Sequence, residues 1–315
     1  MQKEIIAQDK KNASFHPFAA RAFAFILFLS FLLVPAYDAR AEWVEWIADA
    51  GLGIEYGTNI NRSSYDSDQR EDSSIIPSVS LGRYNQLSDS TRLRATLDFE
   101  GGLYGTYDLL NYGKAGLNLS VRQKLGFGAD APWLRPHLSF SYVDFSEDTR
   151  DSSLYEAGIS LGKHLTDRLT GQIWYSYSVR NGKDGEVSFG MPTDVFDQKI
   201  HAYSIEASYV VTDLVLVTGS YALRSGDFDS SCTPTNFSWV LQKEDVLAAT
   251  SDDAYTENYC VYRLSGYVNS YSVDASYALF AGHGSLNMGY QLNQGTADEL
   301  QYTSSAVRFN FMYNY

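Results

Sequence analysis

Apolar and polar residues alternate along most of the chain, and the last nine residues show the pattern most clearly. Val307, Phe309, Phe311, Tyr313 and Tyr315 occupy every second position, with mostly polar residues between them. Successive side chains of a β-strand point to opposite faces. This segment is therefore predicted to be a strand with one apolar and one polar face, which suits a wall between lipid and water.

Similar segments recur in order along the chain. They cover residues 48–58, 74–87, 91–104, 113–127, 133–145, 153–165, 169–181, 200–211, 214–225, 261–277, 285–294 and 301–315. Short connections at 88–90, 128–132, 166–168, 212–213 and 278–284 alternate with mostly longer, polar ones near 59–73, 105–112, 146–152, 182–199, 226–260 and 295–300. Short periplasmic turns and long external loops are typical of bacterial outer-membrane barrels, and an even strand number leaves both chain ends on the periplasmic side. The sequence predicts an all-β fold: an antiparallel transmembrane β-barrel of about twelve strands in up-and-down meander order.

A soluble, exported β-sandwich is the alternative, since its strands alternate too. In the segment 91–104, Arg92, Arg94, Asp98 and Glu100 share one face. A sandwich could carry such a row only on its outer surface, whereas a barrel can direct it into a polar lumen. Because the split recurs in other segments, the membrane barrel is favoured. Trp43, Trp46 and Trp133 lie beside predicted periplasmic ends and suit an aromatic girdle there.

The amino-terminal segment has the pattern of an export signal. Basic residues precede an apolar run at 22–34, and Ala39-Arg40-Ala41 supplies a small-x-small cleavage site. A membrane anchor is the alternative, but the run is shorter than the ~20 residues that span a bilayer. We expect residues 1–41 to be a cleaved signal peptide and residues 42–315 to form one barrel domain in the outer membrane of a Gram-negative cell.

Composition and charge narrow the class of partner. Aromatic residues make up 15% of the chain, and the mean hydropathy of −0.25 is too low for a helical membrane protein. The formal net charge of −14 argues against a nucleic-acid partner. The expected partners are outer-membrane lipid and lipopolysaccharide, together with the barrel-insertion machinery, and we expect a monomer.

The largest predicted loop, residues 226–260, has two features of its own. Cys232 and Cys260, the two cysteines of the chain, lie near its ends. An oxidising periplasm would let them form a disulfide, and two free thiols are the alternative. Within the loop, residues 238–247 are predicted to form a short amphipathic helix.

Charged residues gather on the predicted lumen face. Its basic members are Arg92, Arg94, Lys114, Arg122, Lys124, Arg135, Arg180, Arg224 and Arg308, and its acidic members are Glu55, Asp98, Glu100, Glu156, Glu206 and Asp274. Charge rings set selectivity in pores, so one interpretation is a pore lining for anionic or polyhydroxylated solutes. The other is a polar core whose charges pair across strands and fill a narrow barrel.

Other chemistry has weaker support. Acidic residues in the external loops could bind calcium, but solvated acids are the commoner case, and we expect no metal site and no cofactor. His137-Leu138-Ser139 matches the His-x-Ser pair of outer-membrane phospholipase A, in which the pair faces lipid. Here Leu138 and Phe140 define the lipid face, which places His137 and Ser139 in the lumen. We therefore expect no enzyme.

One stretch carries a resemblance to known barrels. The segment Gly53-Ile54-Glu55-Tyr56-Gly57-Thr58-Asn59-Ile60-Asn61-Arg62 resembles the end of the first strand in porin-like barrels associated with exopolysaccharide export and in the barrel domain of the surface lipoprotein assembly modifier. Assembly modifiers carry a helical repeat domain before the barrel, and this chain shows none. The resemblance implies a stand-alone outer-membrane barrel.

These observations lead to three functional hypotheses. The first is a porin-like channel or export component for small anionic or saccharide solutes. The second is a closed barrel that acts as a surface assembly or adhesion platform through its external loops, and an outer-membrane lipid hydrolase is the remotest. The likeness to outer-membrane barrels as a class also implies that the aromatic terminal strand is an assembly signal, carried by Phe309, Phe311, Tyr313 and Tyr315.

Overall fold

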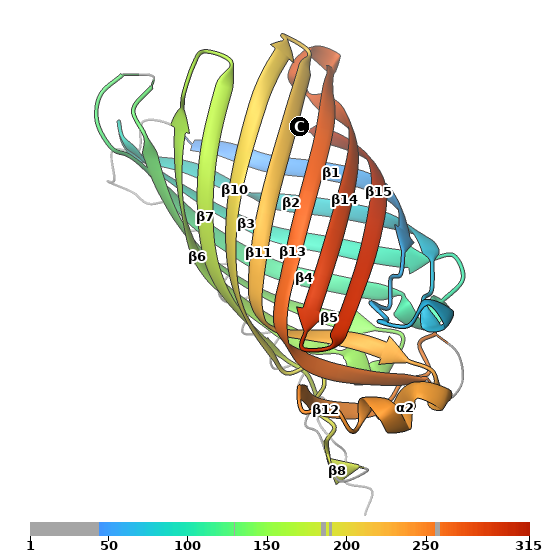
Figure 1. The fold of residues 1–315 in the computed structure, drawn as a ribbon. Coiled ribbons are helices and arrows are strands. Elements are labelled where there is room, and N and C mark those ends of the chain that lie inside the picture. The colour runs from blue at the N-terminus through green and yellow to red at the C-terminus, as the bar shows by residue number, and fades with distance from the viewer. Residues whose placement is uncertain (1–43, 129, 184–186, 189–190, 256–258) are drawn as a thin grey trace, which may run out of the picture. The chain divides into compact units, whose positions relative to one another are not determined.

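Twelve long strands form the body of the protein (Figure 1). The computed structural model describes residues 44–315 except 129, 184–186, 189–190 and 256–258, so the expected signal peptide and Trp43 lie outside the described residues. The strands are β1 (Val44–Thr58), β2 (Asp72–Ser88), β3 (Thr91–Tyr104), β4 (Tyr112–Lys124), β5 (Trp133–Phe145), β6 (Ser152–His164), β7 (Leu169–Asn181), β10 (Gln198–Thr212), β11 (Val215–Cys232), β13 (Cys260–Leu279), β14 (Gly284–Ala297) and β15 (Leu300–Asn314). All twelve predicted strands are present, with ends shifted by at most seven residues, the largest shift being at the end of β11.

The sheet closes on itself. Each of these strands pairs antiparallel with its neighbours in the chain, and β1 also pairs with β15, from Asp49 opposite Asn314 to Thr58 opposite Ser305. Closure satisfies the backbone groups of both edge strands, as a barrel in lipid requires. The predicted fold, an up-and-down antiparallel transmembrane barrel, is confirmed.

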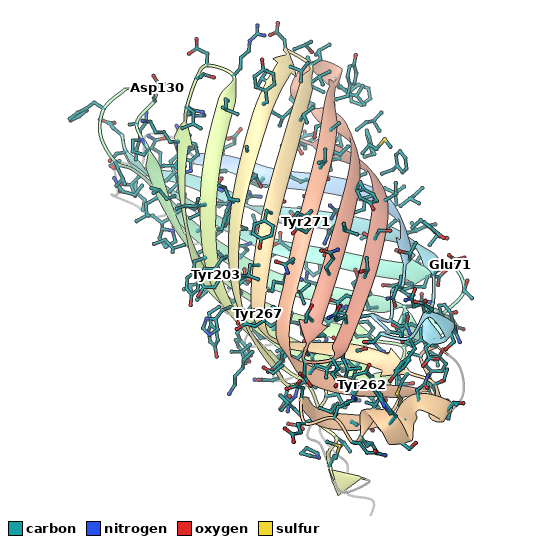
Figure 2. The ribbon with its side chains drawn as sticks, in the orientation of Figure 1. Glu71, Asp130, Tyr203, Tyr262, Tyr267 and Tyr271 are labelled. Carbon is teal, nitrogen blue, oxygen red and sulfur yellow. A yellow bond between two sulfur atoms is a disulfide. The ribbon has the colours of Figure 1, made fainter. Side chains whose placement is uncertain are left out.

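The two faces of the wall differ as the alternation predicts. Leu52, Ile54 and Phe309 point outward and are about half exposed, while Glu55 and Arg308 lie on the other side of the same strands. Tyr203, Tyr267 and Tyr271, labelled in Figure 2, belong to the same exposed outer set, which extends over most strands. So large an exposed apolar surface is stable in lipid and not in water. No helix within the described residues is long and apolar enough to cross a membrane.

The tryptophans near the short-turn end behave differently from one another. Trp46 is 60% exposed, and the Arg83 guanidinium lies 4.7 Å from its ring centre on the outer face. The girdle role predicted for Trp133 is wrong, because this side chain is only 4% exposed and lies against the backbone of Gly162. Leu134 and Leu138 face lipid, so strand alternation directs Trp133 into the lumen.

The connections alternate in length as predicted. At one end the turns are residues 89–90, 125–132, 165–168, 213–214 and 280–283. At the other end, called the outer end here, the connections are residues 59–71, 105–111, 146–151, 182–197, 233–259 and 298–299. The last is shorter than expected because β14 and β15 continue to Ala297 and Leu300, which leaves two residues between them.

At the outer end, β11 and β13 continue beyond the barrel wall as a paired hairpin. Their ladder runs to Cys232 opposite Cys260, and the predicted disulfide joins these residues, with Cα atoms 5.1 Å apart. Gly226 lies opposite Gly266, and Gly226 has φ +138°. A side chain at Gly226 would collide with the Lys199 carbonyl, so the absence of Cβ allows the hairpin to bend there. Figure 1 shows the ends of β11 and β13 running across the end of the barrel.

The predicted helix at 238–247 is wrong in its position. Helix α2 (Pro234–Val240) begins earlier because proline is well suited to the first helical turn. Residues that the prediction assigned to its second half instead begin strand β12 (Val246–Ser251), which pairs with β13. Two further short strands, β8 (Val187–Ser188) and β9 (Met191–Pro192), lie in the connection between β7 and β10.

Candidate functional site

The middle of the lumen carries charges that pair across strands. Arg308 Nη2 lies 3.5 Å from Asp274 Oδ1, and the pair spans β14 where Gly289 leaves room. Lys114 and Glu100 approach to 3.9 Å. These side chains are partly exposed, so each pair contributes at most about 1 kcal/mol to stability. A third pair joins Arg94 to Asp49, also at 3.9 Å, so the polar-core interpretation holds for this part of the wall.

His137 also takes part in a lumen pair. Its Nε2 lies 3.0 Å from Glu156 Oε1, and its ring packs against Trp174 at 5.9 Å. Its Nδ1 has no hydrogen-bond partner among the described residues. Ser139 opposes Glu156 on the neighbouring strand, so the His-x-Ser segment faces the lumen and not lipid. This placement agrees with the sequence-based orientation and separates the segment from a lipid substrate.

Near the short-turn end the lumen is different, because basic side chains lie side by side. Arg92 of β3 is directly opposite Arg122 of β4, and Arg135 follows on β5 opposite Ser160 of β6. Lys124 shares a cavity of about 100 Å³ with Arg92 and Arg122, and Asp89 also borders this cavity. Like charges that face each other across strands destabilise a sheet. In the described residues none of these four cations forms an ion pair.

Neutral groups support this basic row. The Arg122 guanidinium lies 4.3 Å from the centre of the Trp133 ring, and Arg92 Nε donates to Gln86 Oε1 at 3.1 Å. An aromatic face attracts a cation without cancelling its charge. The row therefore keeps its positive field in the lumen.

The outer end of the lumen is spanned by one element, which we call the lid: the described residues of 227–265, comprising the ends of β11 and β13, helix α2 and β12. The lid contacts the β1–β2 connection through Arg62, whose Nη1 lies 2.8 Å from Asp229 Oδ1. Asp68 accepts hydrogen bonds from Thr233 N at 3.0 Å and Asn236 Nδ2 at 2.8 Å. Burial alone would raise the pKa of Asp68, but these hydrogen bonds outweigh it and hold the pKa below its usual value.

A buried ion pair ties the lid to the β5–β6 connection. Arg150 pairs with Asp252, and both side chains are almost wholly enclosed, at 8% and 0% exposure. Burial opposes the charge on Arg150, but the attraction of Asp252 raises its pKa above the ordinary value. The Arg150 guanidinium also lies 5.4 Å from the ring centre of Tyr255 in the lid.

The lid reaches the remaining outer connections as well. Leu110 of the β3–β4 connection packs against Ala254 and Tyr255. Arg263 lies 3.4 Å from Asp194 in the β7–β10 connection. The β14–β15 connection is reached through an ion pair between Lys243 and Glu299. Because these five connections lie around the whole ring of strands, an element that touches all of them must cross the mouth of the barrel.

Two of the acidic loop residues bind groups of the protein itself and are not solvated as expected. Asp68 and Asp252 are buried and bind lid or loop groups, so the expectation of solvated acids is wrong for them. Among the described residues no three His, Cys, Asp or Glu side chains are grouped closely enough to hold a metal ion.

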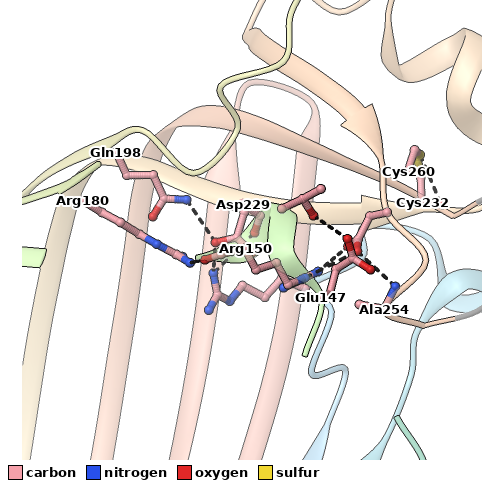
Figure 3. Close-up of polar contacts among 11 residues, drawn as sticks. Glu147, Arg150, Arg180, Gln198, Asp229, Cys232, Ala254 and Cys260 are labelled. Atoms are coloured by element: carbon pink, nitrogen blue, oxygen red, sulfur yellow. Dashed lines mark hydrogen bonds and ion pairs between the residues drawn. A yellow bond between two sulfur atoms is a disulfide. The ribbon is translucent and has the colours of Figure 1, made fainter. Parts of the chain in front are cut away.

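Beneath the lid lies a cavity of about 330 Å³. Arg62, Phe228 and Asp229 belong to the lid and to the loop beside it, and the barrel wall supplies Arg180 and Arg224 among other residues. Figure 3 shows Arg180 and Gln198 beside Asp229, with Arg150 next to them. Gln198 Nε2 donates to Asp229 Oδ1 at 3.1 Å. This cavity joins residues of the lid to inward-facing residues of the wall.

The sequence predicted which wall residues face inward, but it did not predict the contacts at the mouth, and the pore-lining role of the wall residues stays a prediction. Strand alternation puts the predicted pore-lining residues on the inner side, where the pairs and the basic row described above are found. Asp98 accepts from Ser80 Oγ at 2.6 Å, and Arg180 lies at the cavity. Arg62, Arg150 and Asp252 were missed, because nothing in the local sequence indicates that a loop residue will meet a partner far along the chain.

Comparisons with known proteins bear on the fold. No protein-family profile and no curated protein sequence matches the chain. An outer membrane channel from Pseudomonas putida F1 has a similar structure, with a TM-score of 0.57 and 12% identity over 89% of this chain and 100% of that one. The outer membrane channel DcaP of Acinetobacter baumannii (TM-score 0.39, 9% identity, 86% and 97% covered) and the toluene transporter TodX of Pseudomonas putida (0.40, 10%, 89% and 90%) are less similar. At 12% identity the first likeness concerns the fold alone: the chain has the closed-barrel fold of an outer-membrane channel.

Proposed function

We propose that the protein is an outer-membrane channel for small anionic solutes. The apolar outer face suits a bilayer, and the polar inner face suits water. The predicted export signal agrees with a location in the outer membrane. The observation that carries the proposal is the basic row of Arg92, Arg122 and Arg135 on adjacent strands.

The basic row destabilises the sheet by charge repulsion, but it can make a pore selective for anions. A polar core that only fills a barrel would alternate charge signs, as the Arg308–Asp274 pair does. Placing Arg92 opposite Arg122 forgoes such pairing and raises the electrostatic potential of the lumen. A ring or row of fixed cations favours anions in a pore. The same charges therefore support anion selectivity.

Reversal potentials in planar bilayers under a salt gradient test this proposal. Wild-type channels are expected to prefer anions, and a variant with Arg122→Ser and Lys124→Ser should shift the reversal potential toward cations. Arg83→Ser is the matched control, because it removes an arginine from the outer face beside Trp46 and should leave selectivity unchanged. A double variant with the wild-type reversal potential would contradict the proposal.

The lid favours a second candidate function, a closed barrel that serves as a surface platform. Its contacts with all five other outer connections make a firm external surface from the loops. The two functions differ in conductance. Silence in bilayers from both the intact protein and variants with a loosened lid would favour the platform, whereas discrete conductance steps support the channel.

A further inference from the structure

The cavity beneath the lid has more positive charge than its own structure requires. Three arginines line it, Arg62, Arg180 and Arg224, and Asp229 is the carboxylate that faces them. Asp227 also borders the cavity, but its Oδ2 accepts from the Lys199 backbone N–H at 2.9 Å on an exposed edge. Asp229 is already shared between Arg62 and Gln198, so an excess of cationic groups remains inside the barrel.

The three arginines differ in how many hydrogen bonds and ion pairs their guanidinium groups form. Arg62 is paired with Asp229 at 2.8 Å. Arg180 donates to Ser152 Oγ at 2.8 Å and to the Arg150 carbonyl at 2.9 Å, and it lies 4.7 Å from the centre of the Phe196 ring.

Arg224 has no such partner. In the part of the chain that the structure describes, its guanidinium makes no hydrogen bond and no ion pair. It is accessible to water within the lumen although it is enclosed by the barrel. Glu156, whose charge is near enough to influence Arg224, already lies 3.0 Å from His137. A guanidinium in this position presents free donors in a fixed planar fork, which is the geometry that binds carboxylate and phosphate oxygens.

The neutral lining completes the chemistry of the cavity. Asn293 Oδ1 accepts from Ser270 Oγ at 2.7 Å and from Gln291 Nε2 at 2.8 Å, and Asn293 Nδ2 reaches Ser304 Oγ at 3.4 Å. These amides and hydroxyls form a connected network along the wall. Such groups, which both donate and accept, can exchange hydrogen bonds with the hydroxyls of a sugar.

We propose that this cavity is a binding site for a small anionic saccharide, with Arg224 as the anchor of its carboxylate or phosphate group. The inference rests on the proposed channel function for the route by which the solute arrives. At about 330 Å³ the cavity is at the small end of ligand pockets, which suits one or two sugar rings. Phe228 and Tyr302, whose rings pack at 5.7 Å, supply an apolar side for the ring face.

Binding to the purified full chain in detergent micelles tests the site without requiring conduction. The probes are D-glucuronate, glucose 6-phosphate and D-glucose, and saturation-transfer NMR or calorimetry measures their affinity. We expect at least one of the two anions to bind and glucose to bind at least about tenfold more weakly. A hydrogen bond to a charged group is stronger than one to a neutral group by an energy that corresponds to about tenfold in affinity. The anion that binds identifies the charged group recognised.

The anchor is tested by substitution. Arg224→Gln should weaken binding of the anion at least about tenfold, and Arg83→Gln, which removes a charge from the outer face, should not. Heat-modifiable gel migration confirms that each variant is folded. No anion binding to the wild type, equal binding of glucose, or equal losses in the two variants would overturn the proposal. Binding by a protein that stays silent in bilayers, also after the lid is loosened, would refute the channel but retain the site. An anion-selective channel without binding would refute the site but retain the channel.

Discussion

The buried pair between Arg150 and Asp252 is predicted to hold the lid over the mouth of the barrel. In the variant Arg150→Ala, the Asp252 carboxylate, fully enclosed in the structure, would lose its cation. Breaking a buried pair by removing one partner costs about 3–5 kcal/mol. Because the pair joins the lid to the β5–β6 connection, this loss falls on the closed lid and not on the strand ladder. At about 1.4 kcal/mol per factor of ten, lid opening should increase about a hundredfold to several thousandfold.

Hydrogen exchange measures this opening directly. The amides of Val261 and Tyr262 are suitable reporters, because both residues are fully buried in the lid. Their exchange should accelerate by the factor given above in Arg150→Ala, while amides in the barrel ladder keep their wild-type protection. Lys183→Ala is the matched control, since Lys183 forms longer and more exposed pairs at 3.4 and 3.7 Å with the same β5–β6 connection. Its loss should cost less than about 1 kcal/mol.

Two results would refute this reasoning. One is lid exchange in Arg150→Ala that matches the wild type or the Lys183→Ala control. The other concerns the double variant Arg150→Met with Asp252→Val, in which apolar side chains of comparable size replace both charges. Such replacements of a buried pair are often neutral, so most of the protection should return. A double variant as open as Arg150→Ala would show that the pair's electrostatics do not hold the lid.

Three further outcomes are expected. The double variant Cys232→Ser, Cys260→Ser loses about 3–4 kcal/mol of restraint on the unfolded loop; the barrel should insert normally while residues 233–259 become sensitive to protease on intact cells, and unchanged resistance would contradict this. Gly226→Ala places a side chain at φ +138° against a backbone carbonyl, so the bend should weaken by about 1–3 kcal/mol and lid exchange should accelerate, whereas wild-type exchange would show that the bend does not need glycine. Converting Phe311 and Tyr313 to Ser should leave the protein exported but poorly inserted, as outer-membrane fractionation and heat-modifiable migration would report, and normal insertion would remove the terminal strand from the assembly signal.

Strand number, order and facing could be predicted from the sequence because each is a local property of a barrel wall. Lipid on one side and water on the other require alternation along every strand. Leu52 and Ile54 are exposed and Glu55 points inward, as the alternation requires. The disulfide was also predictable, because an exported chain with two cysteines near the ends of one loop has few other choices.

The mouth of the barrel depended on tertiary structure. Arg150 and Asp252 are separated by 102 positions, and nothing near either residue indicates the other. The segment 246–251 is a strand because it pairs with the free edge of the extended end of β13. The periodicity of the sequence does not show that this edge is available. Alternation decides which face a wall residue takes, but the partner of a loop residue depends on how the closed ring brings distant loops together. For that reason the sequence determined the barrel and the inward position of Arg224, whereas only the folded chain placed the lid and the cavity beneath it.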